Sequence, residues 1–200
     1  MKNVKQLKLE MKKINEAIFK IVSFYECPPN CHAYCCVKLE FIDLTDIEYN
    51  KLHRLSYEKA DKAQKEKIND RTYAHRLHQP CPFLGTDELC TAYNIRPIRC
   101  HTYPFSLTDK PSPFMQIFPC LIGKEIIKDF IKYMIFTMEK NNDIQINTRR
   151  LEFSEYLGKL DEKSNLFYSS TNSSVEVFGV AYNEIINFSN YLNNTKTLQR

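Results

Sequence analysis

The segment CPPNCHAYCC, residues 27–36, places four thiols within ten residues. Thiolates are soft ligands that suit zinc and iron–sulfur sites, and ligands close together in the chain reach one ion at little cost in loop-closure entropy. Pro28 and Pro29 stiffen this loop. Cys35 and Cys36 are adjacent, so we expect their side chains to diverge, one toward a metal here and the other toward a second metal or another vertex of one cluster.

The other four cysteines follow at wider spacing, as Cys81, Cys90, Cys100 and Cys120. All eight cysteines and all nine prolines of the chain lie between Cys27 and Cys120. A proline beside a thiol fixes the backbone before any metal arrives. Arg96 and Arg99 are placed to lower thiol pKa values or to offset the negative charge of a thiolate site, although Arg96-Pro97 can also simply open a short helix.

The order of these pieces resembles a cysteine-cluster family, written CxxCxxCC, that is described as a zinc- or iron-chelating domain. The family pattern continues with Cys-Pro-x-Leu, then Cys-x-x-Tyr-x-x-Arg-Pro-x-x-Cys-x-x-Tyr/Phe-Pro, and lastly a Cys before a Gly. Here those pieces are residues 81–84, 90–104 and 120–123, and the resemblance covers 27–124. The first cluster departs from the pattern, because gaps of three residues replace gaps of two.

The thiol clustering and the resemblance together predict a zinc or iron site. The candidate metal ligands are the eight thiols Cys27, Cys31, Cys35, Cys36, Cys81, Cys90, Cys100 and Cys120. They allow two four-thiolate sites, or one site plus structural or reactive thiols. Their spacing matches neither the bacterial ferredoxin run nor paired zinc fingers. We favour an iron–sulfur cluster over zinc, and either over disulfides or free thiols. His32 and His101, each beside a cysteine, are further candidates for ligands or hydrogen-bond partners.

Length and composition fit one cytoplasmic domain. The chain has 200 residues, 43% of them hydrophobic, and a net charge of +4, which allows a real core and gives no case for nucleic acid. We find neither an export signal nor the roughly 18 apolar residues of a membrane span, and clustered thiols in the cytoplasm indicate metal or redox chemistry. The four glycines are isolated, which excludes a P-loop and a Gly-rich dinucleotide or S-adenosylmethionine loop.

We predict a mainly α fold. Helices near the N- and C-termini pack against a small, irregular centre, which is rich in Cys and Pro, contains short strands and is held together by metal. Apolar residues at steps of three and four predict helices over 1–25 and 122–140. Thr45–Glu48 has the form of a capping box that opens a helix from Asp46 to about Ser56. Residues 57–70 are polar on nearly all sides, so we expect a solvated helix or a loose arm there.

The remaining segments give weaker signals. Between 78 and 120 the prolines exclude long helices and central strands. Elsewhere we expect strands within 37–44 and 175–180, a hairpin that turns at 85–87, helices over 153–162 and 182–192, and a turn over 164–174. We divide the chain into an N-terminal amphipathic helix (1–26), a metal-binding domain (27–124) and a mainly helical region that packs on it (125–200).

Three functions are compatible with these features. The first is metal binding, used for electron transfer or metal handling. The second is implied by the resemblance, because the family includes flagellin lysine N-methylases that look like carriers of an iron–sulfur cluster: a protein-modifying enzyme with the cluster near its active site. The third is an interaction module with a structural metal, whose helices bind a protein partner. We expect a metal ion and a protein partner or substrate, and neither nucleic acid nor a membrane.

Overall fold

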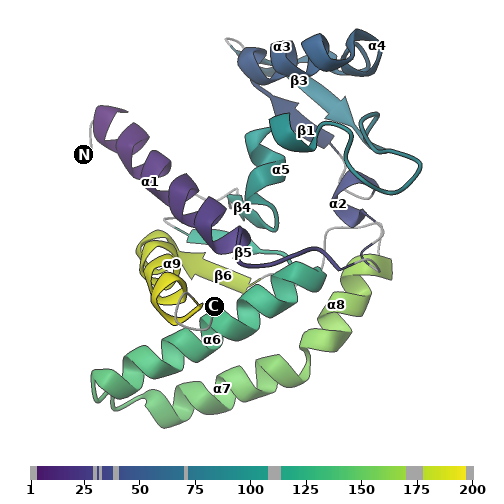
Figure 1. Ribbon diagram of the computed structural model, residues 1–200. Coiled ribbons are helices and arrows are strands. Elements are labelled where there is room, and N and C mark those ends of the chain that lie inside the picture. The colour runs from purple at the N-terminus through teal and green to yellow at the C-terminus, as the bar shows by residue number, and fades with distance from the viewer. Residues whose placement is uncertain are drawn as a thin grey trace. The chain divides into compact units, whose positions relative to one another are not determined.

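The protein folds into two compact units, seen here in a computed structural model that describes residues 4–28, 31, 33–37, 41–69, 72–107, 114–169 and 178–196. Unit 1 combines both ends of the chain, residues 1–28 and 104–200, and unit 2 is the segment 29–103. The predicted metal-binding region, 27–124, therefore includes parts of both units. Figure 1 shows both units, with most of their elements labelled.

Unit 1 consists of helices around a small sheet. Its elements are α1 (Val4–Val22), β4 (Phe105–Leu107), β5 (Phe114–Ile117), α6 (Leu121–Lys140), α7 (Ile146–Gly158), α8 (Leu160–Ser169), β6 (Phe178–Ala181) and α9 (Tyr182–Lys196). The sheet is antiparallel in the order β4-β5-β6, with Phe105 opposite Ile117 and Phe114 opposite Ala181. α1 packs against α9, and α6 runs beside α7 (Figure 1).

The core of unit 1 forms where apolar faces of α1, α6 and α9 meet the sheet. On α1 the buried positions Ile14, Ile18 and Ile21 recur at steps of four and three, as the periodicity predicts. They join buried side chains that include Phe105, Ile117, Ile126, Ile127, Phe130, Ile131 and Phe188. Because burying one such side chain contributes roughly 1.5–3 kcal/mol, this cluster is the main source of stability for unit 1.

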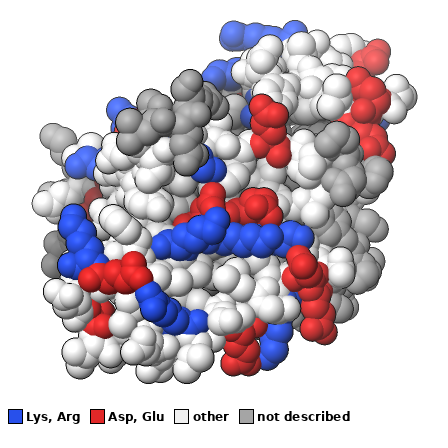
Figure 2. Space-filling view, turned by 60° about the horizontal axis from the view of Figure 1, so that its bottom comes forward, with Lys and Arg blue, Asp and Glu red and all other residues white. Residues whose placement is uncertain are grey.

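Charged groups also join the helices of unit 1. Asp129 on α6 accepts a hydrogen bond from the Tyr25 hydroxyl at 2.9 Å and pairs with Lys132 at 3.0 Å and with Lys196 of α9 at 3.2 Å. Burial alone raises the pKa of Asp129, but these hydrogen bonds outweigh it and lower the pKa overall. On the face viewed in Figure 2, basic and acidic side chains lie next to one another.

Unit 2 combines a second antiparallel sheet with short helices. Its elements are α2 (Tyr34–Val37), β1 (Phe41–Leu44), α3 (Asp46–Leu55), α4 (Tyr57–Ala60), β2 (Gln64–Asn69), β3 (Thr72–His78), a 3₁₀ turn (Tyr93–Ile95) and α5 (Ile98–Thr102). The strand order is β1-β3-β2. Its core contains Ile42, Leu44, Leu52, Ala60, Ala63, Leu77, Phe83 and Ala92.

The structure confirms a mainly α fold with short strands in small sheets. The helices predicted over 1–25, 122–140 and 182–192 are present as α1, α6 and α9, and α3 begins at the predicted Asp46. The prediction for 57–70 is wrong: one helical turn, α4, is followed by strand β2, because this polar segment pairs with β3 as an edge strand that periodicity alone does not reveal.

The predicted turn at 164–174 is also wrong in its described part. Helix α8 extends from Leu160 to Ser169 and buries Leu160 and Ser164. Residues 170–174 lie outside the described residues, as do 38–40 and 175–177 of the two predicted strands. Among the helices of the described chain, none combines the length and the apolar character that crossing a bilayer requires.

Candidate metal centre

Unit 2 contains six of the eight predicted ligands. These are Cys31, Cys35, Cys36, Cys81, Cys90 and Cys100, whereas Cys27 and Cys120 belong to unit 1. Cys81, Cys90 and Cys100 pack against the hydrophobic core of unit 2, and none of the three takes part in a disulfide. The core therefore holds three of these thiols in place.

Cys81 and Cys90 lie in similar local turns. After Cys81, the backbone N–H groups of Phe83 and Leu84 donate hydrogen bonds to its sulfur. After Cys90, the N–H of Ala92 donates to the sulfur in the same way. Backbone N–H donors directed at a sulfur favour the thiolate, which is the form that binds a metal. The backbone that follows each of these cysteines therefore favours its thiolate form.

A short hairpin links the two turns. The N–H of Thr91 donates to the carbonyl of Phe83 at 2.8 Å, and Leu84 forms an isolated antiparallel bridge with Cys90. At the tip, the N–H of Gly85 donates to a carbonyl four residues later at 2.7 Å. The predicted hairpin at 85–87 is therefore present as a bridge and a tight turn, and it brings two cysteines nine positions apart in the chain close together.

The first cysteine segment joins this hairpin through Cys36. The carbonyl of Cys36 accepts a hydrogen bond from the N–H of Cys81 at 2.8 Å. The sulfurs of Cys35 and Cys36 lie 4.0 Å apart, so the prediction that these side chains diverge is wrong. The short helix α2 carries both, and the backbone bond to Cys81 turns Cys36 toward the hairpin, where its thiol hydrogen bonds to Cys81.

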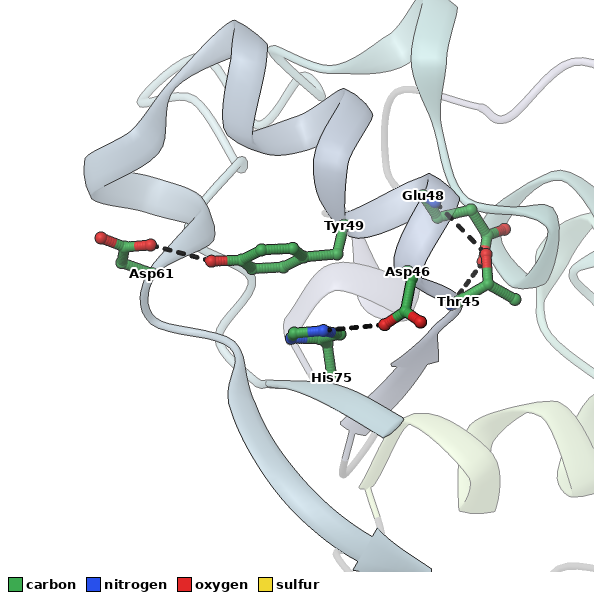
Figure 3. Close-up of polar contacts among 6 residues, drawn as sticks. All are labelled: Thr45, Asp46, Glu48, Tyr49, Asp61 and His75. Atoms are coloured by element: carbon green, nitrogen blue, oxygen red, sulfur yellow. Dashed lines mark hydrogen bonds and ion pairs between the residues drawn. The ribbon is translucent and has the colours of Figure 1, made fainter. Parts of the chain in front are cut away.

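Cys100 is positioned by a contact between two helices. The predicted capping box is present: the side chain of Glu48 accepts hydrogen bonds from the N–H and hydroxyl of Thr45 at 2.9 and 2.8 Å (Figure 3). The second carboxylate oxygen of Glu48 accepts from the N–H of Ile98 at 2.6 Å, at the start of α5. One side chain thus caps α3 and fixes the beginning of the helix that carries Cys100.

Aromatic stacking in turn anchors α3 on β3. The rings of Tyr49 and His75 stack with centroids 4.0 Å apart and planes inclined by 10°. The Tyr49 hydroxyl donates to Asp61 at 2.9 Å, and Nε2 of His75 lies 3.1 Å from a carboxylate oxygen of Asp46 (Figure 3). These contacts tie α3 to the sheet, and through Glu48 they support α5.

Hydrogen bonds between neighbouring sulfurs give the thiols of unit 2 different pKa values. Hydrogen bonding from the Cys36 thiol lowers the pKa of Cys35, and it lowers the pKa of Cys81 to about 7 against the opposing effect of burial. The same hydrogen bonds raise the pKa of Cys36. Of these three thiols, Cys35 and Cys81 therefore lose their protons more readily than Cys36 does.

The charges of Cys35 and Cys81 also act on Cys90 and Cys100. Burial raises the pKa of Cys90, and it raises that of Cys100 to about 12. In both cases the charges of Cys35 and Cys81 raise the pKa further. Five thiols of unit 2 thus interact with one another, and a bound cation would relieve their mutual repulsion and the cost of burying them.

Arg96 supplies positive charge to this group. Its guanidinium lowers the pKa of Cys35, Cys90 and Cys100. The guanidinium carbon lies 3.7 Å from the centre of the Tyr93 ring. Its Nε is buried and has no hydrogen-bond partner among the residues that the structure describes. A buried donor without an acceptor is costly, and the Nε of Arg96 has a hydrogen bond left to donate.

Lys59 also lies near these thiols, although no sequence pattern marks it. Its ammonium lies 3.4 Å from the Thr91 hydroxyl and 5.9 Å from the centre of the Phe83 ring, and its charge lowers the pKa of Cys81. Lys59 is 22 positions before Cys81 in a segment that resembles solvated charge, so only the fold reveals this contact.

Of the histidine candidates, His101 has a pKa lowered by burial and then by Arg96, and His32 lies outside the described residues.

In unit 1, Cys120 begins α6. Its buried sulfur accepts a hydrogen bond from the N–H of Gly123 at 3.4 Å. A methyl group on Gly123 would lie 1.8 Å from the carbonyl oxygen of Phe118, so only glycine fits here. The Cys-x-x-Gly spacing therefore has a local structural reason. Cys27 is exposed just after α1.

The donor set fits a thiolate metal site, although the sulfurs are not drawn together around one point. Within the described part of the chain, no three Cys, His, Asp or Glu side chains are close enough to enclose an ion. A tetrahedral thiolate site with metal–sulfur bonds of about 2.3 Å has its sulfurs about 3.8 Å apart, close to the 4.0 Å between Cys35 and Cys36. The N–H···S bonds and the orphaned Nε of Arg96 suit bound thiolates.

Comparison with known protein families gives a match over the cysteine-containing part of the chain. A model of the CxxCxxCC family, described as "Putative zinc- or iron-chelating domain", matches residues 26–134, more than half of the chain. No curated protein and no solved structure matches the chain. The matched range contains all eight cysteines, because it begins one residue before Cys27 and ends within α6.

Proposed function

The chain belongs to the CxxCxxCC family, and from this we propose that it is a cytoplasmic metal-binding protein whose thiols hold iron as an iron–sulfur cluster, with zinc as the competing metal. The observation that carries the proposal is the mutual interaction of Cys35, Cys36, Cys81, Cys90 and Cys100 in unit 2. Five interacting thiols exceed the four that either kind of site requires.

The ligands we propose come first from unit 2. Cys81 and Cys90 have backbone N–H groups directed at their sulfurs, and Cys100 is held by α5. Cys35 and Cys36 complete the group, and Cys31 acts on Cys35 electrostatically. Side-chain rotation about χ1, which has three staggered states, is the adjustment that would bring these sulfurs onto a metal. Cys27 and Cys120 stay candidate ligands from unit 1.

The spacing of the ligands argues against a paired zinc finger. Zinc fingers take their ligands as two closely spaced pairs, whereas Cys81, Cys90 and Cys100 are separated by eight and nine residues. The donors are thiols, which iron–sulfur clusters use. When bound, such a cluster would accept and donate single electrons, and the role we propose is electron transfer or metal handling.

Anaerobic purification with metal analysis tests this proposal. We expect brown protein that contains iron and absorbs at about 400 nm, together with an electron paramagnetic resonance signal in one oxidation state. Colourless protein with stoichiometric zinc would show that the bound metal is zinc and not iron. Protein without metal after expression in iron- and zinc-supplemented media would contradict the whole proposal.

Variants of single cysteines test the ligand set. Cys81→Ser and Cys90→Ser should lose most of the metal, and Thr86→Ser at the tip of the same hairpin should keep it. Cys27→Ser and Cys120→Ser decide whether unit 1 contributes ligands. Full metal content in both Cys81→Ser and Cys90→Ser would refute the site in unit 2.

A further inference from the structure

Arg96 combines two properties that a surface arginine does not need. Its guanidinium carbon lies 3.7 Å from the centre of the Tyr93 ring, an arrangement that fixes the plane of the guanidinium. Its Nε is buried without a hydrogen-bond partner in the described chain. The side chain is thus held in one orientation with one donor directed into the interior and unused, which costs free energy unless something accepts that hydrogen bond.

The surroundings of Arg96 show which acceptors are near. The guanidinium acts electrostatically on the thiols of Cys35, Cys90 and Cys100, which come from three separate segments of unit 2. Each of these sulfurs is a weak acceptor as a thiol and a much stronger one as a thiolate. An acceptor for Nε therefore arises when these thiols lose their protons, as they do on binding a metal.

We propose that Arg96 is a positioning residue of the metal site: its Nε donates a hydrogen bond to the sulfur of a metal-bound thiolate, and its charge offsets the negative charge of the thiolate group. This inference rests on the proposed metal binding. Of Arg96 and Arg99, the two arginines between Cys90 and Cys100, it assigns this role to Arg96, and it gives the unused Nε donor a partner. The Tyr93 ring, which is 60% exposed, forms the outer support of the guanidinium.

The inference predicts how metal affinity depends on residue 96. Charge-assisted hydrogen bonds are roughly twice as strong as neutral ones, so losing one should weaken binding by about tenfold. Arg96→Gln removes the charge and Nε, and Arg96→Lys keeps the charge and a donor in a different geometry. We expect Arg96→Lys to bind with an affinity between those of Arg96→Gln and the natural chain. Arg54→Gln, an exposed arginine in the last turn of α3, is the matched control.

Anaerobic titration of the full-length, metal-stripped protein with Co²⁺ measures both affinity and bonding. A hydrogen bond to a thiolate stabilises its lone pairs and raises the energy of sulfur-to-metal charge transfer. We therefore expect Arg96→Gln to bind Co²⁺ with the natural stoichiometry, about tenfold more weakly, and with its charge-transfer band at longer wavelength. Arg54→Gln should match the natural protein in both respects.

The possible outcomes separate the inference from the proposed function. Natural protein that does not bind Co²⁺ contradicts the proposed function itself. Natural protein that binds, with Arg96→Gln equal to it in affinity and in band position, overturns the inference alone. If Arg96→Gln does not fold, as circular dichroism would show, Arg96→Lys decides: weaker binding with a shifted band supports the inference, and natural binding with an unshifted band overturns it.

Discussion

Individual residues set the chemistry of the thiols in unit 2. The pKa of Cys81 falls to about 7 because the Cys36 thiol and two backbone N–H groups donate to its sulfur. The pKa of Cys100 rises to about 12 because this thiol is buried near other sulfurs. The same side chain thus differs in reactivity at two positions of one site, and the difference arises from hydrogen bonding and burial.

Alkylation of the metal-free protein tests this difference. Since a pKa of about 7 makes half of the Cys81 thiols thiolate at neutral pH, modification of Cys81 by iodoacetamide should increase between pH 6 and 8 and then level off. Cys90 and Cys100, with raised pKa values, should react mainly above that range. Peptide mass spectrometry gives the rate for each thiol. Equal rates for the three at pH 7 would show that these environments are wrong.

Two glycines provide a matched pair of substitutions in unit 1. Gly123→Ala would place a methyl group 1.8 Å from the carbonyl oxygen of Phe118, so the backbone must shift, and we expect a loss of more than about 2 kcal/mol in unfolding free energy. At Gly158, at the end of α7, a methyl group meets no described atom within 4 Å. Gly158→Ala should therefore stabilise by about 0.5–1 kcal/mol. Urea denaturation measures both, and equal effects would contradict the packing around Gly123.

At the residue scale, the sequence shows only what is local in the chain. The clustering of Cys27, Cys31, Cys35 and Cys36 is visible in ten consecutive residues. The approach of Lys59 to Cys81 depends on how α4 packs beside the hairpin, and no local pattern encodes it. The expected divergence of Cys35 and Cys36 failed because a backbone hydrogen bond from Cys81 orients Cys36.

At the scale of elements, one capping box links two helices. Glu48 caps α3, as its spacing from Thr45 predicts, and it also accepts a hydrogen bond from Ile98, 50 positions later. The first contact follows from sequence spacing, and the second depends on the fold. Strand β2 likewise depends on the fold, because its polar residues form a strand only by pairing with β3.

Replacing Glu48 tests the link between α3 and α5. Glu48→Ala removes the acceptor for Thr45 and for Ile98, so we expect unit 2 to lose about 1–2 kcal/mol of stability. Glu58→Ala on α4, at an exposed acidic side chain of the same unit, should change stability by less than about 0.5 kcal/mol. Thermal unfolding of the metal-free proteins compares the two. If both variants unfold at the same temperature, the second role of Glu48 is wrong.

At the scale of the whole molecule, the two units differ in how much apolar surface they bury. The core of unit 1 is rich in isoleucine and phenylalanine, whereas that of unit 2 includes Ala60, Ala63 and Ala92 and is bordered by cysteines. A small unit with a modest core often needs a metal to complete its stability. We therefore expect the metal to stabilise unit 2 far more than unit 1.

Hydrogen exchange with and without metal tests this difference. Chelation should speed amide exchange in α3, β3 and α5 of unit 2, because metal binding and folding are coupled there. Exchange in α1, α6 and α9 should change little. The ratio of exchange rates is read peptide by peptide by mass spectrometry. A uniform change over both units, or a change confined to unit 1, would contradict the expected dependence of unit 2 on the metal.

X-ray absorption at the iron and zinc edges of protein purified anaerobically measures the ligands of the bound metal directly. If the thiols of unit 2 hold the metal, sulfur should dominate its first coordination shell, at about 2.3 Å, and iron should be the metal present. Cys81→Ser should then lower the amount of sulfur-bound metal. A first shell of nitrogen and oxygen, or protein without metal at either edge, would contradict a thiolate metal site in unit 2.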